Sequence, residues 1–310
     1  MNDNTRPLFT IFTATFNRKN LLPRAYESVK AQTFRDFEWL IIDDGSTDET
    51  DELIKKWQAE ADFPIVYKWQ PNGGKHTAFD EAARIHRGRL ITPLDSDDEL
   101  VPETLERYKF HWDNLSDEQK NKVGCMICLS KDQNGNIVGD RFPGNLPVQI
   151  NDLMKMYIVK KIKGEKGGVA KSEAFTMYPF PEEVRNVYVP ESVFQHRLAK
   201  DWKALFINEV LRVYWIDERD DHDSDKLLSK ENYPGNQLYH LAFLNYTMRL
   251  FWSVPKIFFA NAVYYVKLSF HLGQGVGRQF KNIQTFSGRL VWLVSLPVGY
   301  VMYLKNKKKH

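Results

Sequence analysis

The chain has 310 residues, of which 43% are hydrophobic and 27% charged, and its formal net charge is +3. This composition is typical of a globular protein with one large domain, or with one domain and an appendage. The small net charge gives no support to nucleic-acid binding. The polar start MNDNTRPLF does not read as a signal peptide, and no run of eighteen apolar residues predicts an obvious membrane span.

The first 112 residues alternate between apolar, β-branched runs and helical patterns. The runs predict strands over residues 8–14, 37–42, 65–69 and 90–94, and the patterns predict helices over 20–32, 49–59, 75–85 and 102–112. Asn20 is expected to cap the first helix and Ser46 or Thr47 the second, while Gly45 allows a tight turn. Strands that alternate with helices predict βαβ units, a parallel sheet and an α/β fold.

Each predicted strand ends in a polar loop. Because the carboxyl ends of parallel strands meet at one edge of a sheet, these loops are expected to surround a ligand there. The chain has neither G-x-G-x-x-G nor G-x-x-x-x-G-K-[ST], so the usual dinucleotide and P-loop fingerprints are excluded.

The loop after the fourth strand is the strongest candidate site. In RLITPLDSDDEL, residues 89–100, an apolar run ends in Asp95, Ser96, Asp97 and Asp98. Three carboxylates at a strand end are costly unless a positive charge lies among them. Hard oxygen ligands that leave room for phosphate oxygens describe a Mg²⁺ or Mn²⁺ site. The alternative is a solvated acidic turn that caps the next helix, and Asp98 is expected to act as such a cap.

The following hundred residues are less regular. We predict a hairpin of residues 123–130 and 137–142, a helix over 147–157, a mobile basic loop over 160–168, a helix over 190–200, a strand over 205–215 and an acidic loop over 217–225. Cys125 and Cys128 form C-x-x-C, a pattern that can indicate redox or zinc chemistry. They lie in the apolar run VGCMICL with no second pair, so we predict a core strand in a protein of a reducing compartment.

From Asn232 onward the sequence becomes rich in aromatic residues, with helical patterns over 238–250 and 257–272. Residues 290–304, LVWLVSLPVGYVMYL, are apolar and precede the basic run KNKKK. This arrangement resembles an interfacial anchor on an anionic membrane, and the alternative is a core helix with a solvated basic tail. We predict a main domain over 1–230, with halves 1–115 and 116–230, and a mainly helical C-terminal region over 231–310.

Four motifs, in order and each at a strand end, resemble the nucleotide-binding half of family 2 glycosyltransferases with the GT-A fold. They are TATFNR at 13–18, IIDDGSTDET at 41–50, PNGGKHTAFDEA at 71–82 and LDSDD at 94–98. The resemblance is strong over the first 112 residues, looser over 165–225 and absent from the C-terminal 80. It implies a Rossmann-like sheet with helices on both faces. It also implies an inverting transfer from a nucleotide-diphosphate sugar, assisted by Mn²⁺ or Mg²⁺.

The resemblance assigns donor-binding roles residue by residue. Thr13, Thr15 and Asn17 would line the base and ribose pocket. Asp43, or alternatively Asp44, would accept a hydrogen bond from the N3–H of a uracil-like base. Asp44 and Ser46 have a turn or cap role as their alternative.

The remaining donor contacts follow from the later motifs. Asn72, Gly73 and Lys75 would lie near the ribose and phosphates, with a solvated lysine at a helix start as the alternative for Lys75. Asp95 and Ser96 would face the ribose or the metal, and Asp97 would be the direct metal ligand.

The resemblance places the general base at a helix start about a hundred residues after the metal motif. Glu191 in the run PES matches that place, although Ser192 stands where relatives have a second acid. The alternatives are a helix-dipole role for Glu191, or a base at Glu182 or Glu183. His222 matches a metal or diphosphate position, and its alternative is a hydrated loop histidine.

We therefore expect a cytoplasmic enzyme that is peripheral at the inner face of the cytoplasmic membrane. It would transfer sugar from a UDP-sugar to a saccharide or lipid-linked saccharide in cell-surface polysaccharide biosynthesis. One alternative is a sugar nucleotidyltransferase, but TATFNRKN lacks the glycine-rich phosphate loop typical of that class. The other is a non-catalytic nucleotide-binding relative, which the retained acids Asp95, Asp97 and Glu191 argue against.

Overall fold

The structure is a computed structural model that describes residues 6–144, 148–216 and 229–307. It contains two compact units. The first comprises residues 1–152, 162–180 and 202–220, and the second comprises 153–161, 181–201 and 221–310. The proposed boundary near residue 230 stays a prediction.

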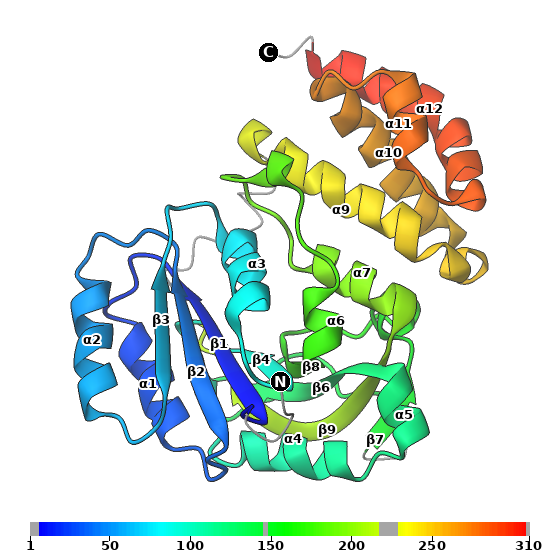
Figure 1. Ribbon diagram of the computed structural model, residues 1–310. Helices are drawn as coiled ribbons and strands as arrows, with labels where there is room; N and C mark the ends of the chain where they lie inside the picture. The colour runs from blue at the N-terminus through cyan, green and yellow to red at the C-terminus, as the bar shows by residue number, and fades with distance from the viewer. Residues whose placement is uncertain (1–5, 145–147, 217–228, 308–310) are drawn as a thin grey trace. The chain divides into compact units, whose positions relative to one another are not determined.

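The first unit is built on a mixed sheet with strand order β3-β2-β1-β4-β8-β6-β9-β5, and β7 pairs with β9 (Figure 1). The strands are β1 (Phe9–Thr15), β2 (Phe37–Asp43), β3 (Ile65–Trp69), β4 (Leu90–Pro93), β5 (Glu99–Leu100), β6 (Val123–Lys131), β7 (Val148–Asn151), β8 (Lys166–Lys171) and β9 (Lys203–Val213). Strands β3, β2, β1 and β4 are mutually parallel, whereas β8 runs antiparallel to β4. The predicted parallel sheet is therefore confirmed for the N-terminal half.

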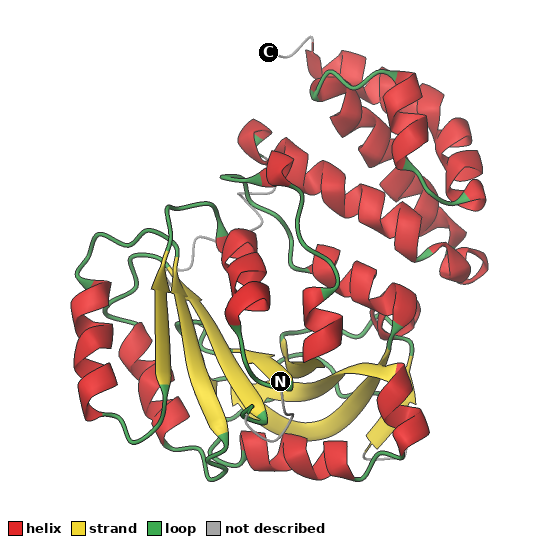
Figure 2. Ribbon diagram, in the orientation of Figure 1, coloured by secondary structure: helices red, strands yellow, loops and turns green. Residues whose placement is uncertain are grey.

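Helices pack against the strands of this unit (Figure 2). They are α1 (Leu22–Lys30), α2 (Thr50–Glu60), α3 (Lys75–Ile85), α4 (Thr104–Asp113), α5 (Asp117–Lys122) and α6 (Ser172–Thr176). Because successive strand residues point to opposite faces, Trp39 of β2 meets Tyr26 of α1 and Trp57 of α2. Phe12 of β1 belongs to the other face and packs against Phe79 of α3, with their ring centroids 5.0 Å apart. Helices thus cover both faces, as predicted.

The caps predicted for the first helices are wrong, although the helices themselves are confirmed. Leu21, not Asn20, precedes α1, and it makes no side-chain cap bond. Glu49, in a left-handed conformation with φ of 62°, precedes α2 in place of Ser46 or Thr47. Ser46 instead accepts a hydrogen bond from the Asn17 amide at 2.8 Å. The polar side chains of this loop therefore tie two strand ends together.

The middle of the chain departs most from expectation. Residues 148–151 form strand β7 against β9, where a helix over 147–157 was predicted, and a π-helical turn, η2 (Lys155–Val159), follows. The predicted hairpin reduces to one bridge between Lys131 and Ile137. Strand β8 begins inside the stretch expected to be a mobile loop. The structure of these segments depends on their pairing with β9 and β6. A local sequence pattern does not reveal that pairing.

Cys125 and Cys128 lie on β6 as buried free thiols, so the predicted core strand is confirmed. Burial raises the pKa of Cys125 to about 12 and that of Cys128 to about 11. Thiols with such pKa values stay protonated and unreactive near neutral pH.

The second unit is helical among its described residues. Its elements are η3 (Glu182–Val184), α7 (Ser192–Asp201), η4 (Lys230–Asn232), α9 (Tyr233–Tyr246), η5 (Met248–Ser253), α10 (Pro255–His271), α11 (Val276–Asn282) and α12 (Phe286–Lys307), in addition to η2. Its core includes the fully buried Phe243, Phe258, Tyr265 and Trp292. Gly299 lets α12 approach α10 closely, because a Cβ there would lie 2.6 Å from the Val266 side chain.

Helix α12 contains the apolar C-terminal segment, and its side chains are partly buried and partly exposed. Val291, Trp292, Ser295 and Gly299 form a buried stripe, whereas much of the rest is apolar and exposed. In the described part of the chain, this helix has the length and apolar composition that crossing a membrane requires, although only 28% of its most apolar window is buried within the protein. No such span was predicted from the sequence.

Candidate functional site

The predicted donor-binding residues of the first unit gather at the carboxyl edge of its parallel strands. Thr13 and Thr15 lie near the end of β1, and Asp43 is the last residue of β2. The acidic turn, residues 95–98, follows β4 directly. In parallel register Thr15 lies beside Asp43, so these loops border one region.

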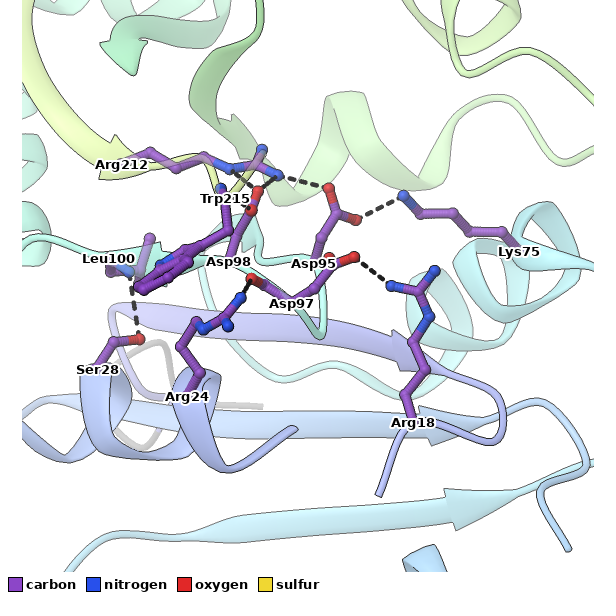
Figure 3. A network of polar contacts seen from close by, with 10 residues as sticks. All are labelled: Arg18, Arg24, Ser28, Lys75, Asp95, Asp97, Asp98, Leu100, Arg212 and Trp215. Carbon is purple, nitrogen blue, oxygen red and sulfur yellow. Dashed lines mark hydrogen bonds and ion pairs between the residues drawn. The ribbon is translucent and has the colours of Figure 1, made fainter. Parts of the chain in front are cut away.

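A buried arginine organises the acidic turn (Figure 3). Arg212 of β9 donates from Nη2 to Asp95 Oδ2 at 2.5 Å and from Nε to Asp98 Oδ2 at 2.8 Å. The backbone amide of Trp215 donates to the other Asp98 oxygen at 3.0 Å. Asp98 is therefore not the exposed helix cap that was predicted, since it is only 1% exposed and holds a buried charge.

Asp95 is shared between two cations from different elements. Its second oxygen accepts from Lys75 Nζ, at the start of α3, at 2.5 Å. Burial opposes ionisation of Asp95, but Lys75 and Arg212 outweigh it and hold the pKa of this carboxyl well below its usual range. Burial raises the pKa of neighbouring Asp98 to about 6, with Arg212 acting in the opposite direction and Asp95 adding to the rise. Asp98 therefore takes up a proton at a higher pH than Asp95 does.

Asp97 faces a different set of partners. Its carboxylate pairs with Arg18, from the loop after β1, and its backbone oxygen accepts from Arg24 Nη1 of α1 at 2.7 Å. The Arg24 guanidinium also lies over the ring of Trp215, 3.7 Å from its centroid. Arg24 therefore ties the acidic turn to the segment after β9. Ser96, the remaining member of the turn, is buried.

The two aspartates at the end of β2 have distinct surroundings. Asp44 accepts from the backbone amides of Gly73 and Gly74 at 3.0 and 2.8 Å, and from the Gln70 side chain at 2.7 Å. These bonds commit its carboxylate to holding the loop after β3. Asp43 accepts from the Tyr67 hydroxyl and the Ser46 amide, each at 2.8 Å.

The neighbouring loop positions are tied together by further bonds. Gly45, with φ of 92°, makes the predicted turn, and any Cβ there would meet the Asn72 amide at 2.9 Å. Asn72 donates to the Asp44 backbone oxygen at 2.9 Å. Asn17 accepts from the Thr47 amide at 2.8 Å.

Thr13 and Thr15 are both buried on β1 but differ in their bonding. The Thr13 hydroxyl accepts from the indole of Trp39 at 3.0 Å. The Thr15 hydroxyl has no hydrogen-bond partner among the described residues. Since buried hydroxyls are normally bonded, Thr15 is suited to meeting a ligand.

The remaining candidates belong to the second unit or to residues that the structure does not describe. Glu191 is exposed in the second unit, where it directly precedes α7 and its backbone oxygen accepts a hydrogen bond from the Phe194 amide at 2.9 Å. It thus sits at the cap position rather than within the first turn. Glu182 and Glu183 belong to η3. His222 and most of the acidic loop lie outside the described residues.

Five residues that build the site were not predicted from the sequence: Arg18, Arg24, Tyr67, Arg212 and Trp215. Arg212 left a usable signal, because one arginine interrupts the apolar strand pattern of LRVYW. A charge within a buried strand needs a buried partner, and the surplus acids after β4 supply it. The other four give no sequence signal of comparable strength.

The carboxylates fit a divalent ion in kind, but only with an exchange of partners. Asp95 and Asp97 supply the hard oxygen donors that Mg²⁺ and Mn²⁺ prefer. Within the described residues, however, no group of three or more His, Cys, Asp or Glu side chains could hold a metal. Both carboxylates are ion-paired, so Asp95 and Asp97 would hold such an ion only together with ligands from outside these side chains.

Comparison with known proteins agrees with this architecture. Residues 10–117 match the family described as Glycosyl transferase family 2. The GalNAc(5)-diNAcBac-PP-undecaprenol beta-1,3-glucosyltransferase of Campylobacter jejuni is 28% identical over 220 residues. That match covers 69% of this chain and 66% of the relative, just under two thirds of its length.

Solved structures share the fold at low sequence identity. TarS 1–349 of S. aureus, in complex with UDP-GlcNAc, is 17% identical with a TM-score of 0.61, over 94% of this chain and 80% of that one. The mannosyltransferase PcManGT from Pyrobaculum calidifontis, in complex with GDP-Man and Mn²⁺, is 16% identical with a TM-score of 0.54, over 98% and 89%. The expected GT-A fold is therefore confirmed, and residues 10–117 are similar to family 2 glycosyltransferases.

Proposed function

We propose that this chain transfers a sugar, with inversion, from a nucleotide-diphosphate sugar to a hydroxyl group of a saccharide or lipid-linked saccharide. The observation that carries the proposal is the acidic turn after β4, in which Asp95 and Asp97 meet three cationic side chains at the carboxyl edge of the sheet. That edge is where open α/β sheets bind their ligands. The relative named for undecaprenol and the neighbour bound to UDP-GlcNAc support this class of acceptor and donor.

The base of the donor is assigned to the carboxyl ends of β1 and β2. Asp43 accepts two hydrogen bonds from Tyr67 and Ser46, and each of its carboxylate oxygens retains a second acceptor site. That capacity suits the N3–H of a uracil ring. The Asp44 carboxylate is occupied by the loop after β3, so Asp43 is the preferred partner. The Thr15 hydroxyl is available to the same ligand.

The diphosphate is assigned to the cationic side of the acidic turn. Lys75 and Arg18 are both partly exposed and can contact phosphate oxygens. Asp95 and Asp97 would hold Mn²⁺ or Mg²⁺, which offsets the negative charge that develops on a departing nucleotide diphosphate. His222 stays a proposed additional ligand by resemblance.

The acceptor hydroxyl needs a base, since an alcohol is a weak nucleophile. Glu191 is proposed for this role by resemblance, with Glu182 and Glu183 as rivals. We expect Glu191→Gln to lower kcat roughly 100-fold or more while leaving UDP affinity unchanged. Glu183→Gln is the control, and a larger loss in that variant would transfer the role to Glu183.

The proposed location is the cytoplasmic face of the membrane, where α12 would lie in the interface. Its exposed residues include Leu293, Val294 and Val298, and Lys305 and Lys307 follow them in the last turn. Apolar residues flanked by lysines are typical of helices that lie on anionic lipid surfaces. A role in cell-surface polysaccharide synthesis would follow from a lipid-linked acceptor.

The direct test is UDP release from a panel of UDP-sugars, with and without Mn²⁺, in the presence of lipid-linked saccharide acceptors. Sugar-dependent release that Mn²⁺ stimulates is the expected result, and Asp97→Asn should abolish the stimulation. Pyrophosphate release from a nucleoside triphosphate would instead indicate a nucleotidyltransferase. Absence of both turnover and UDP binding at millimolar concentration would reject the proposal.

A further inference from the structure

Arg18 occupies the carboxylate that the proposed function reserves for the divalent ion. Its guanidinium pairs with Asp97, the acid expected to ligate the metal directly (Figure 3). The Arg18 side chain is 40% exposed and that of Asp97 is 24% exposed, so solvent and ligands can reach the pair. In the described residues Asp97 is the one carboxylate paired with Arg18.

The backbone around Arg18 is anchored by several bonds, whereas its partly exposed side chain is held by its ion pair with Asp97. Asn17 is held by Ser46 and Thr47 in the loop after β2, through bonds of 2.8 Å each. The Lys19 amide donates to Asp48 in the same loop at 3.0 Å. A change of partner by Arg18 therefore needs only rotation of its side chain, with no rearrangement of the loop.

The other arginines of the site are fixed. Arg212 is buried and serves two carboxylates. Arg24 is bonded to the Asp97 backbone oxygen and stacked on Trp215. Of these three side chains, Arg18 is thus the one that can move away when another cation arrives.

A divalent ion and a guanidinium at one carboxylate repel each other, so binding of the ion favours departure of a cation that is free to move. The diphosphate of a donor provides an alternative partner, since guanidinium groups bind phosphate oxygens in bidentate geometry. We infer that Arg18 is an exchangeable counterion. When the divalent ion binds Asp97, the Arg18 side chain moves from Asp97 to the diphosphate of the donor. The inference rests on the proposed function and deepens it, because it couples metal binding to donor binding.

The coupling has a distinctive signature. Without nucleotide, Arg18 competes with the ion and keeps its affinity low. With nucleotide, Arg18 contributes to diphosphate binding. Replacing it should therefore strengthen metal binding alone and weaken nucleotide binding in the presence of metal. Since linkage is reciprocal, the factor by which UDP tightens Mn²⁺ equals the factor by which Mn²⁺ tightens UDP.

The test measures Mn²⁺ affinity of the full chain from the electron paramagnetic resonance signal of free Mn²⁺, with and without saturating UDP, and UDP affinity by calorimetry. For Arg18→Gln we expect Mn²⁺ affinity without UDP to rise roughly fivefold, and the coupling factor to fall by about tenfold, within the usual range of such couplings. Arg18→Lys keeps the charge but loses the bidentate fork. Its Mn²⁺ affinity and coupling factor should lie between those of the wild type and of Arg18→Gln. Arg84→Gln, which removes one exposed charge on α3, is the matched control and should match the wild type.

Opposite shifts of the two affinities support the exchange and are not what partial unfolding would produce. An Arg18→Gln variant whose Mn²⁺ affinity without UDP is unchanged or weaker, while UDP still binds, overturns this inference and leaves the proposed function standing. A wild-type chain that binds neither UDP nor Mn²⁺ at millimolar concentration overturns both. Should Arg18→Gln fail to fold, Arg18→Lys decides by the same two measurements.

Discussion

Arg212 shows how much of this site depends on one buried charge. It bridges Asp95 and Asp98, two acids of the turn after β4, from a strand more than a hundred positions later. Removing one partner of a buried ion pair leaves uncompensated charge, at a cost of roughly 3–5 kcal/mol. We therefore expect Arg212→Met to lower the free energy of unfolding by about that amount, measured by urea denaturation.

Positioning by Arg212 can be separated from stability with a conservative variant. Arg212→Lys keeps the charge but cannot span both carboxylates with a rigid fork. It should restore most of the stability while leaving kcat low, because Asp95 loses its fixed orientation. Equal recovery of kcat and stability would show that charge alone matters at this position.

Asp98 gives the fold a specific pH dependence. Burial raises its pKa to about 6 in the folded chain, so the folded state binds this proton more tightly than the unfolded state does. Its contribution to the free energy of unfolding is therefore complete at acidic pH, below the ordinary carboxyl pKa, and is lost as the pH rises through about 6.

The measurement is the difference in unfolding free energy between wild type and Asp98→Asn, taken by denaturation at several pH values. Subtracting the unfolding free energy of the variant from that of the wild type cancels the contributions of groups that titrate alike in both proteins. The difference should favour the wild type most at acidic pH and decline as the pH rises through about 6. A difference that grows with pH would mean that Arg212 lowers the pKa of Asp98 instead.

At the level of residues, the sequence predicted where the acids gather but not what neutralises them. Asp95 and Asp97 are identifiable because a strand pattern ends immediately before them. The role of Asp98 was mistaken because its partner Arg212 is 114 positions away. From the local pattern alone, an acid that follows a strand is expected to cap the next helix. In the folded chain Asp98 instead pairs with the buried Arg212.

At the scale of elements, Asp44 joins the end of β2 to the loop after β3 through hydrogen bonds. It accepts backbone bonds from Gly73 and Gly74, so the loop that carries Asn72 and Lys75 depends on it. Asp44→Ala would leave these amides unpaired, at a cost of roughly 1–3 kcal/mol for each buried donor. We expect a fall in thermal stability together with weaker UDP binding. Asp51→Ala, which removes an exposed acid of α2, is the control and should change neither.

Elements with a strong local pattern were predictable, and those defined by pairing were not. The bounds of α3 and β3 coincide with expectation because periodicity and flanking glycines agree there. Residues 148–151 form a strand because β9 offers them an edge, with Val148 opposite Ile207. A sequence pattern does not show which edge a segment will meet, and in this case the edge overrides the helical pattern.

At the scale of the whole molecule, charge is distributed unevenly along the chain. Residues 232–310 contain ten Lys or Arg and no Asp or Glu, whereas the preceding residues contain 33 and 40. The same region exposes apolar side chains along α12, among them Val294, which is 66% exposed. Basic charge and exposed apolar surface in one region complement an anionic lipid bilayer.

We therefore predict that the full chain co-sediments with vesicles that contain anionic lipid, and far less with neutral vesicles. Val294→Glu should weaken this binding about tenfold, since it removes an apolar contact and adds repulsion. Its folding stability should change little because the residue is exposed. Phe110→Glu, on the exposed side of α4, is the matched control and should bind as the wild type does.

Salt distinguishes an interfacial helix from one that crosses the bilayer. Binding through charge and a shallow apolar face weakens as ionic strength rises, because screening shortens the range of the lysines. Extraction of the chain from anionic vesicles by concentrated salt is the expected outcome. Retention in salt, with release only by detergent, would show that α12 spans the bilayer and would contradict the interfacial assignment.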